Sequence, residues 1–269
     1  MKTSAPILVT GGTGTLGGHV VPLLREAGHE VRILTRHSRA AEPGIEYHVG
    51  DLLQGEGRAD SGEGAGTGAG TSLAAALAGV ETVLHLAGGP KGDDEATRSL
   101  VRAARTAGVR HLVYISVIGA DRIPLAYFRA KLGAERAVAE SGIPWTTLRA
   151  AQFHDLALTV AQKMGKLPVV PAPGGMRWQP VDARDVAARL VELALSAPAG
   201  LVPDLSGPEV YGLGDLVRGY VESTGRRRPL VPVRVPGKVG RAYRAGENLA
   251  TAGVTGTRTW EAFLSERVG

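Results

Sequence analysis

The chain has 269 residues, of which 43% are hydrophobic, and a formal net charge of +5. This length and composition suit one large α/β domain with an appended lobe. There is no cysteine, which excludes disulfides, thiolate metal sites and cysteine nucleophiles. No apolar run approaches the roughly 18 residues of a membrane span, so we expect a cytoplasmic protein with no membrane partner. We also expect no bound metal.

The basic residues are mostly arginines spread along predicted helices among acidic residues. Only 226–228 forms a run of three arginines. We interpret this run as a solvated loop rather than a phosphate or nucleic-acid patch, and we expect no nucleic-acid partner.

The first predicted element is an apolar strand, 6–10, which leads into glycines at 11, 14 and 17. A helix follows and ends near Gly28, and residues 30–36 form a second strand. A tight glycine turn between a strand and a helix N-terminus is what a dinucleotide pyrophosphate requires. The segment therefore predicts a dinucleotide-binding βαβ unit.

Strands and helices alternate over the next hundred residues, interrupted by a glycine-rich segment, 54–72, that we expect to be a disordered surface insertion. The predicted strands are 44–51, 82–87, 111–117 and 143–149, and the predicted helices are 73–78, 93–107 and 125–140. This order predicts a doubly wound parallel sheet, a Rossmann fold, over residues 1–150.

From residue 150 onward the alternation loosens and proline becomes frequent. We assign 151–269 to a small substrate lobe with elements that return to the core. Its predicted helices follow Asp182 and cover 214–223 and 259–264. Either Asp182 or Asp185 would cap the first of them.

Several residues at strand ends are candidates for coenzyme binding. Arg36 ends the second strand, where an arginine pairs with the 2′-phosphate of NADP and a carboxylate would select NAD. We therefore expect NADP(H) to be preferred, with NAD(H) possible; the alternative is an exposed basic turn. Asp51 ends the third strand near a possible adenine position, although an acidic turn residue would look the same. Ala87 and Gly88 end the fourth strand.

The spacing of Tyr127 and Lys131 places a phenol and an ammonium on one face of a helix. A phenol needs a nearby positive charge to exchange protons near neutral pH. Ser116 ends the preceding strand, where its hydroxyl could hold a substrate carbonyl; a simple turn residue is the alternative.

These motifs together resemble the short-chain dehydrogenase/reductase superfamily, specifically its atypical NmrA-like branch. The resemblance covers nearly the whole chain and includes the segments 10–17, 127–135, 148–155 and 179–186. It implies that the glycine loop holds the pyrophosphate, Arg36 the 2′-phosphate and Asp51 the adenine. The expected coenzyme contacts are Gly11, Thr13, Gly14, Thr15, Leu16, Gly17, Arg36, Asp51, Leu52, Ala87, Gly88 and Lys131.

The resemblance also implies catalytic roles. Lys131 would bond the nicotinamide ribose, Tyr127 would protonate the substrate oxygen as hydride arrives, and Ser116 would position that oxygen. A wall between nicotinamide and substrate would include Gln152, Phe153 and His154.

Two of the residues assigned to the substrate side have alternatives. Trp178 could stack on a flat substrate or pack beneath the lobe. His154 could form a proton relay with Asp155 or be a structural residue near a helix cap.

One departure from the family matters, because Ser116 lies nearer in sequence to Tyr127 than the serine does in most classical members. Many relatives in this branch lack one or more of the three residues, and some are regulators without turnover. We expect an NADP(H)-dependent oxidoreductase that reduces a carbonyl, enone or quinone group of a small apolar or aromatic molecule. The alternatives are a non-catalytic NADP(H) sensor and an epimerase or dehydratase, and the protein would be a monomer or homodimer.

Overall fold

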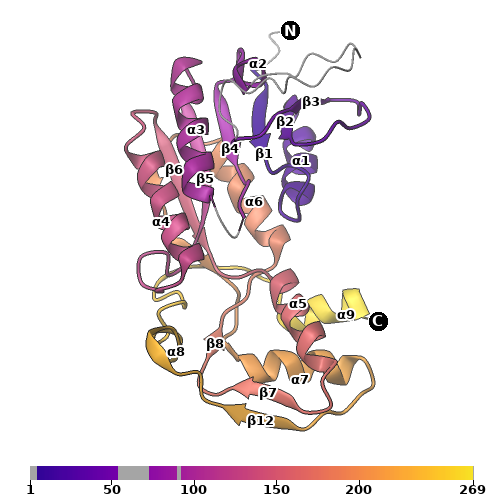
Figure 1. The fold of residues 1–269 in the computed structure, drawn as a ribbon. Coiled ribbons are helices and arrows are strands. Elements are labelled where there is room, and N and C mark those ends of the chain that lie inside the picture. Colours follow the sequence, from indigo (N-terminus) through magenta and orange to yellow (C-terminus); the bar gives the residue numbers. More distant parts are fainter. Residues whose placement is uncertain (1–4, 54–72, 90–91, 269) are drawn as a thin grey trace, which may run out of the picture. The chain divides into compact units, whose positions relative to one another are not determined.

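The computed structural model describes residues 5–53, 73–89 and 92–268 (Figure 1). The glycine-rich segment 54–72 lies outside the described residues. The chain folds into two compact units. Unit 1 takes in the described residues of Met1–Ile115, Ala130–Thr147 and Ala187–Val202, and unit 2 takes in Ser116–Arg129, Leu148–Val186 and the described part of Pro203–Gly269.

Unit 1 is built on a parallel sheet with the strand order β6-β5-β4-β1-β2-β3. The register aligns Ile7 of β1 with Val31 of β2 on one side and with Thr82 of β4 on the other. This order, 3-2-1-4-5-6 from the other edge, is that of the doubly wound dinucleotide fold, so the predicted fold class is confirmed. The strands are β1 (Ile7–Thr10), β2 (Val31–Thr35), β3 (Ile45–Val49), β4 (Thr82–His85), β5 (His111–Val117) and β6 (Trp145–Ala150), with β9 (Gly200–Leu201) beside β6.

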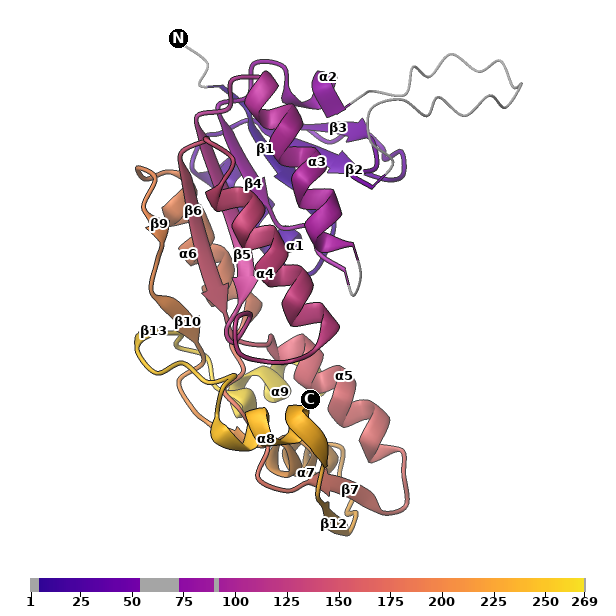
Figure 2. The same cartoon turned by 60° about the vertical axis from the view of Figure 1, so that its left-hand side comes forward.

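Helices cover both faces of this sheet. Figure 2 shows α3 and α4 on one face and α1 and α6 on the other. In α3 the buried positions Thr97, Leu100, Val101 and Ala104 recur every three or four residues, which is the pattern of one apolar helix face. The helices are α1 (Gly17–Glu26), α2 (Leu73–Leu77), α3 (Asp93–Thr106), α4 (Ala126–Ala139) and α6 (Ala183–Ala194).

Unit 2 is formed by helices and short strands. Helix α5 (His154–Gly165) packs on α7 (Leu213–Ser223), and α7 packs on α9 (Trp260–Val268). The short strands pair as β7 (Val170–Pro173) with β12 (Leu230–Val233), β8 (Arg177–Trp178) with β11 (Tyr211–Gly212), and β10 (Asp204–Ser206) with β13 (Gly253–Thr255). Helix α8 (Gly237–Ala245) completes the unit. Leu205 of β10 also pairs with Ala150 at the end of β6.

Aromatic side chains form the interior of unit 2. The indole of Trp260 is buried and stacks on Phe263 at 5.6 Å between ring centroids. Its N–H donates to the carbonyl of Leu216 at 3.2 Å, so the polar atom of this large buried ring is satisfied. These contacts fix α9 against α7.

Asp182 caps α6, which decides between the two predicted capping residues. Its Oδ1 accepts the amide N–H of Arg184 at 2.8 Å, and the Arg184 guanidinium also bonds both carboxylate oxygens. Burial by itself would raise the pKa of Asp182, but hydrogen bonds from Arg184 outweigh it and hold that pKa far below its usual range. Asp185 instead accepts the amide N–H of Thr257 at 2.9 Å. None of the helices among the described residues is long and apolar enough to cross a bilayer.

Candidate functional site

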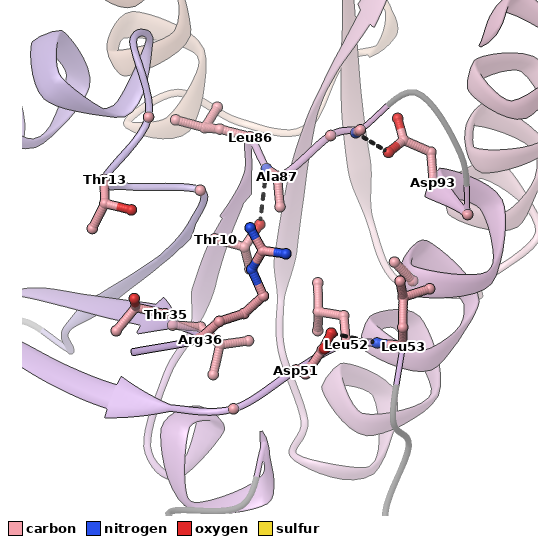
Figure 3. A pocket seen from close by; sticks show the side chains of 18 of the residues that line it. Thr10, Thr13, Thr35, Arg36, Asp51, Leu52, Leu53, Leu86, Ala87 and Asp93 are labelled. Atoms are coloured by element: carbon pink, nitrogen blue, oxygen red, sulfur yellow. Dashed lines mark hydrogen bonds between the residues drawn. The ribbon is translucent and has the colours of Figure 1, made fainter. Parts of the chain in front are cut away.

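A cavity of about 560 Å³ lies in unit 1 where the carboxyl ends of β1, β2, β3 and β4 meet (Figure 3). This edge of a doubly wound sheet is where such folds bind ligands. The cavity is lined by Thr10, Gly11, Thr13, Gly14, Leu34, Thr35, Arg36, His37, Arg39, Gly50, Asp51, Leu52, Leu53, Leu86, Ala87, Gly88, Gly89, Gly92, Asp93 and Ala96.

Two glycines of the turn after β1 leave no room for a side chain. Gly11 has a φ of +72°, and a Cβ added to it would lie 2.6 Å from the backbone nitrogen of Ala87. A Cβ on Gly17 would collide with the carbonyl oxygen of Gly11. Helix α1 then begins without a side-chain cap. The turn therefore combines closely approaching glycine backbone with an uncapped helix N-terminus, which fits a diphosphate.

The end of β2 supplies positive charge to the cavity. Arg36 and Arg39 line it, and Arg36 makes no ion pair within the described part of the chain. Glu42, the acid that follows them in the sequence, accepts a hydrogen bond from the hydroxyl of Tyr47 at 2.7 Å. No carboxylate at the end of β2 therefore opposes a phosphate beside Arg36, whose side chain extends over the cavity in Figure 3.

Asp51 and Leu52 line the cavity from the segment after β3. Oδ1 of Asp51 accepts the amide N–H of Leu53 at 3.0 Å, an Asx turn that orients the carboxylate. Asp51 is therefore a turn residue that also lines the cavity, and its contact with adenine stays a prediction.

A buried histidine contacts a residue of the cavity wall, Thr10. Nδ1 of His85 lies 2.6 Å from Oγ1 of Thr10, and its Nε2 lies 3.0 Å from Oγ1 of Thr97. Thr97 donates its hydroxyl to the carbonyl of Asp93, and Thr10 accepts the amide N–H of Ala87. These directions assign the proton of His85 to Nε2. Burial, together with the charge of Lys131, lowers the pKa of His85 to about 3, which keeps the ring neutral.

Lys131 is buried in unit 1 beside the cavity wall. Its Nζ lies 2.9 Å from Oδ2 of Asp93 and donates to the carbonyl of Ile115 at 3.4 Å. It also lies 5.2 Å from the centre of the Tyr114 ring. A Cβ added to Gly88 would be 3.0 Å from the same nitrogen. The ammonium therefore sits directly against the backbone that follows β4.

Ser116 and Tyr127 belong to unit 2. Ser116 is buried near the end of β5, and its Oγ has no hydrogen-bond partner among the described residues. Tyr127, in the first turn of α4, is 38% exposed. Lys131 follows it by four residues on the same helix, which is the spacing that places two side chains on one helix face.

Gln152 and Phe153 follow β6 in unit 2. The amide of Gln152 is buried, and within the described residues neither its nitrogen nor its oxygen has a partner. Phe153 is half-buried and immediately precedes α5. An unpaired buried amide is costly, so Gln152 is chemically suited to a ligand.

The other two residues predicted to line the substrate are buried. His154 has no exposed surface; its ring centroid lies 5.1 Å from that of Phe263, and its Nδ1 lies 3.8 Å from Asp182 rather than beside Asp155. This placement supports the structural interpretation of His154 over the proton relay with Asp155. Trp178 is 8% exposed and lies in β8, which favours packing over stacking on a substrate.

The cavity brings together most of the predicted coenzyme contacts. Thr15, Leu16, Gly17 and Lys131 do not line it, although Lys131 contacts Asp93, which does. Asp93 and His85 were not predicted from the sequence to belong to this site. An acidic residue in the first turn of a helix indicates only a favourable helix dipole, so no sequence signal distinguished Asp93.

Comparison with known proteins assigns this architecture to a family. A family model described as NAD(P)H-binding matches residues 11–197. The "NAD(P)H azoreductase" of Xenophilus azovorans is 30% identical over 230 residues, which cover 82% of this chain and 74% of that protein.

Two solved structures are similar over almost the whole chain. The NADPH-dependent quinone oxidoreductase QOR2 of Escherichia coli, complexed with NADPH, has a TM-score of 0.76 at 22% identity and covers 97% of this chain and 99% of its own. The triphenylmethane reductase of Citrobacter sp., complexed with NADP(H), has a TM-score of 0.75 at 22% identity with the same coverage. At this identity the two structures establish a shared fold.

Proposed function

Since the chain belongs to the NAD(P)H-binding family, we propose that it is an NADP(H)-dependent reductase of the NmrA-like group of atypical short-chain dehydrogenases/reductases. Its substrate is a small apolar or aromatic molecule with a quinone, enone or other carbonyl group. The relative named above as azoreductase supports the reaction class.

The coenzyme is held by the residues of the cavity in unit 1. The glycine turn from Gly11 to Gly17 receives the diphosphate on backbone amides, and Arg36 receives the 2′-phosphate. Among the described residues, no carboxylate at the end of β2 opposes a phosphate, and this supports NADP(H) over NAD(H) as the coenzyme. Lys131 bonds the ribose next to the nicotinamide.

The observation that carries the proposal is a pair of unsatisfied buried groups in unit 2. Ser116 Oγ and the Gln152 amide lie near the ends of β5 and β6, and neither has a partner within the described chain. The two strand ends are adjacent, since the amide N–H of Ile118 donates to the carbonyl of Ala150 at 3.0 Å. A substrate carbonyl oxygen is the acceptor that such buried donors lack.

Reduction of a carbonyl adds one hydride and one proton. The bound coenzyme supplies the hydride. The hydroxyl of Tyr127 gives its proton to the substrate oxygen, while Ser116 donates a hydrogen bond that holds this oxygen in place. Because Tyr127 is 38% exposed, its hydroxyl is reprotonated from water.

The test is NADPH consumption with a panel of quinones, enones, ketones and azo dyes. Tyr127→Phe should lower kcat about 100-fold for a carbonyl substrate, the usual contribution of one general acid. Tyr220→Phe, which alters a half-buried tyrosine on α7, is the matched control and should leave kcat unchanged. NADPH binding without turnover of any compound would contradict a reductase and identify a coenzyme sensor.

A further inference from the structure

Lys131 and Asp93 form an ion pair that is almost completely withdrawn from water. Their side chains are each 6% exposed, and Nζ lies 2.9 Å from Oδ2. Removing two charges from water costs more than an ordinary pair returns unless the geometry is well satisfied. Such a pair therefore requires an explanation beyond surface charge balance.

Both carboxylate oxygens of Asp93 are engaged. Oδ1 accepts the amide N–H of Gly89 at 2.6 Å, a contact drawn in Figure 3, and Oδ2 makes the ion pair with Lys131 without the geometry of a hydrogen bond. Gly88 and Gly89 line the coenzyme cavity, as Asp93 itself does. One side chain thus connects the cavity wall after β4 to the lysine of α4.

The surroundings of the ammonium leave it little freedom. The Tyr114 ring, the Ile115 carbonyl and the backbone of Gly88 contact it or lie close by. His85, whose ring stacks on Tyr114 at 5.4 Å between centroids, is neutral and supplies no charge to the group. Asp93 is the anion that neutralises Lys131 among the described residues.

The next residue in the chain provides a contrast. Asp94 pairs with Arg98 at 3.2 Å, but the two side chains are 32% and 52% exposed. That pair is an ordinary i, i+4 surface interaction of small energy. Asp93 and Asp94 thus have the same chemistry at neighbouring positions, and only Asp93 is buried against the cavity.

We propose that Asp93 is a positioning residue for coenzyme binding. One carboxylate oxygen fixes the Lys131 ammonium and the other fixes the Gly89 amide, so that the lysine and the loop after β4 are held in fixed positions relative to each other. Asp93 acts through Lys131. The inference rests on the proposed function only in taking Lys131 to be a coenzyme ligand.

A double-variant cycle tests the proposal with the full-length protein and NADPH. The four proteins are the wild type, Asp93→Asn, Lys131→Met and the double variant. Asparagine retains an oxygen for the Gly89 amide but removes the charge. Two quantities are measured for each protein, the urea midpoint of unfolding without coenzyme and the dissociation constant for NADPH.

We expect each single substitution to raise the NADPH dissociation constant about tenfold, and the double variant to show about the same tenfold rise rather than a hundredfold one. The urea midpoint should fall in both single variants and partly recover in the double variant, because no buried charge is left unpaired. Since the double variant is neutral at both positions, it remains informative if a single variant folds poorly. Asp94→Asn is the matched control and should change the NADPH dissociation constant less than twofold.

Independent effects on NADPH binding, which multiply to about a hundredfold, would overturn the proposal. An unchanged dissociation constant in Asp93→Asn would do the same, even if the urea midpoints showed coupling, because the pair would then serve stability alone. Turnover assays separate this proposal from the proposed function. If the effects of the two substitutions on NADPH binding are coupled but the protein reduces no substrate, only the reductase function is refuted. If the protein reduces substrate but the two effects on NADPH binding are independent, only the role of Asp93 is refuted.

Discussion

Nδ1 of His85 lies 2.6 Å from Oγ1 of Thr10, and this contact joins the end of β4 to the end of β1 at a residue of the cavity wall. The second ring nitrogen lies 3.0 Å from Oγ1 of Thr97 on α3. One neutral imidazole therefore connects two strands and a helix of unit 1, and its protonation would place a second cation near Lys131.

The low pKa of His85 predicts a specific pH dependence of stability. Because the folded pKa is about 3 and the ordinary value is 6.5, the unfolded chain binds the proton first. The free energy of unfolding should fall as the pH drops from about 6.5 toward 3, by at most about 1.4 kcal/mol per pH unit from this group. Urea unfolding between pH 7 and pH 5 measures the slope.

His85→Gln should show a shallower slope over this range than the wild type. His19→Gln, which removes a half-buried imidazole from α1, serves as the control and should retain the wild-type slope. Equal slopes for the wild type and His85→Gln would show that the buried ring does not govern acid stability.

The segment from Gly11 to Gly18 predicts a sharp contrast between its first and last glycines. Gly11→Ala forces a Cβ to within 2.6 Å of the Ala87 nitrogen at a φ of +72°. We expect a loss of about 2 to 4 kcal/mol in the free energy of unfolding, from strain and overpacking together. Gly18→Ala is the control, because nothing lies within 4 Å of its added Cβ.

Gly18 is exposed in the first turn of α1, where alanine should stabilise the helix by about 0.5 to 1 kcal/mol. Urea unfolding of both variants measures the difference. If Gly11→Ala were as stable as Gly18→Ala, the close approach of the turn to the backbone after β4 would be wrong.

Arg36 predicts the choice of coenzyme. Arg36→Ala should weaken NADPH binding by about 1.5 to 3 kcal/mol, the value of a charge-assisted contact, and leave NADH binding nearly unchanged. Calorimetric titration with each coenzyme measures the two losses. Arg102→Ala, the control, removes the same charge from the exposed face of α3 and should change the affinity for neither coenzyme. Equal losses of NADPH and NADH affinity in Arg36→Ala would assign the 2′-phosphate to another residue.

The first half of the fold was predictable because its signals are local. The strand His111–Val117 is a largely apolar run, and α3 has the apolar spacing of a helix, so both can be identified from neighbouring residues alone. The glycine turn is likewise identified by its position between a strand and a helix. The Thr35-Arg36 segment likewise places its charge at a strand end. These features gave the fold class and most of the cavity wall.

The second half was less predictable because its strands are short and their partners are remote. Val170 of β7 pairs with Leu230 of β12, sixty residues away, and neither strand exceeds four residues. For the same reason the pair Asp93–Lys131 could not be predicted from the sequence. The sequence suggested a contact of His154 with adjacent Asp155, whereas its imidazole lies nearer to Asp182. Contacts of this kind are set by tertiary packing, which no local pattern encodes.

The most direct measurement is a crystal structure of the protein grown with NADP⁺. We expect density for the diphosphate against the amides of the 11–17 turn, with the 2′-phosphate within ion-pair distance of Arg36. Density for the dinucleotide outside this cavity, or a 2′-phosphate directed away from Arg36, would contradict it.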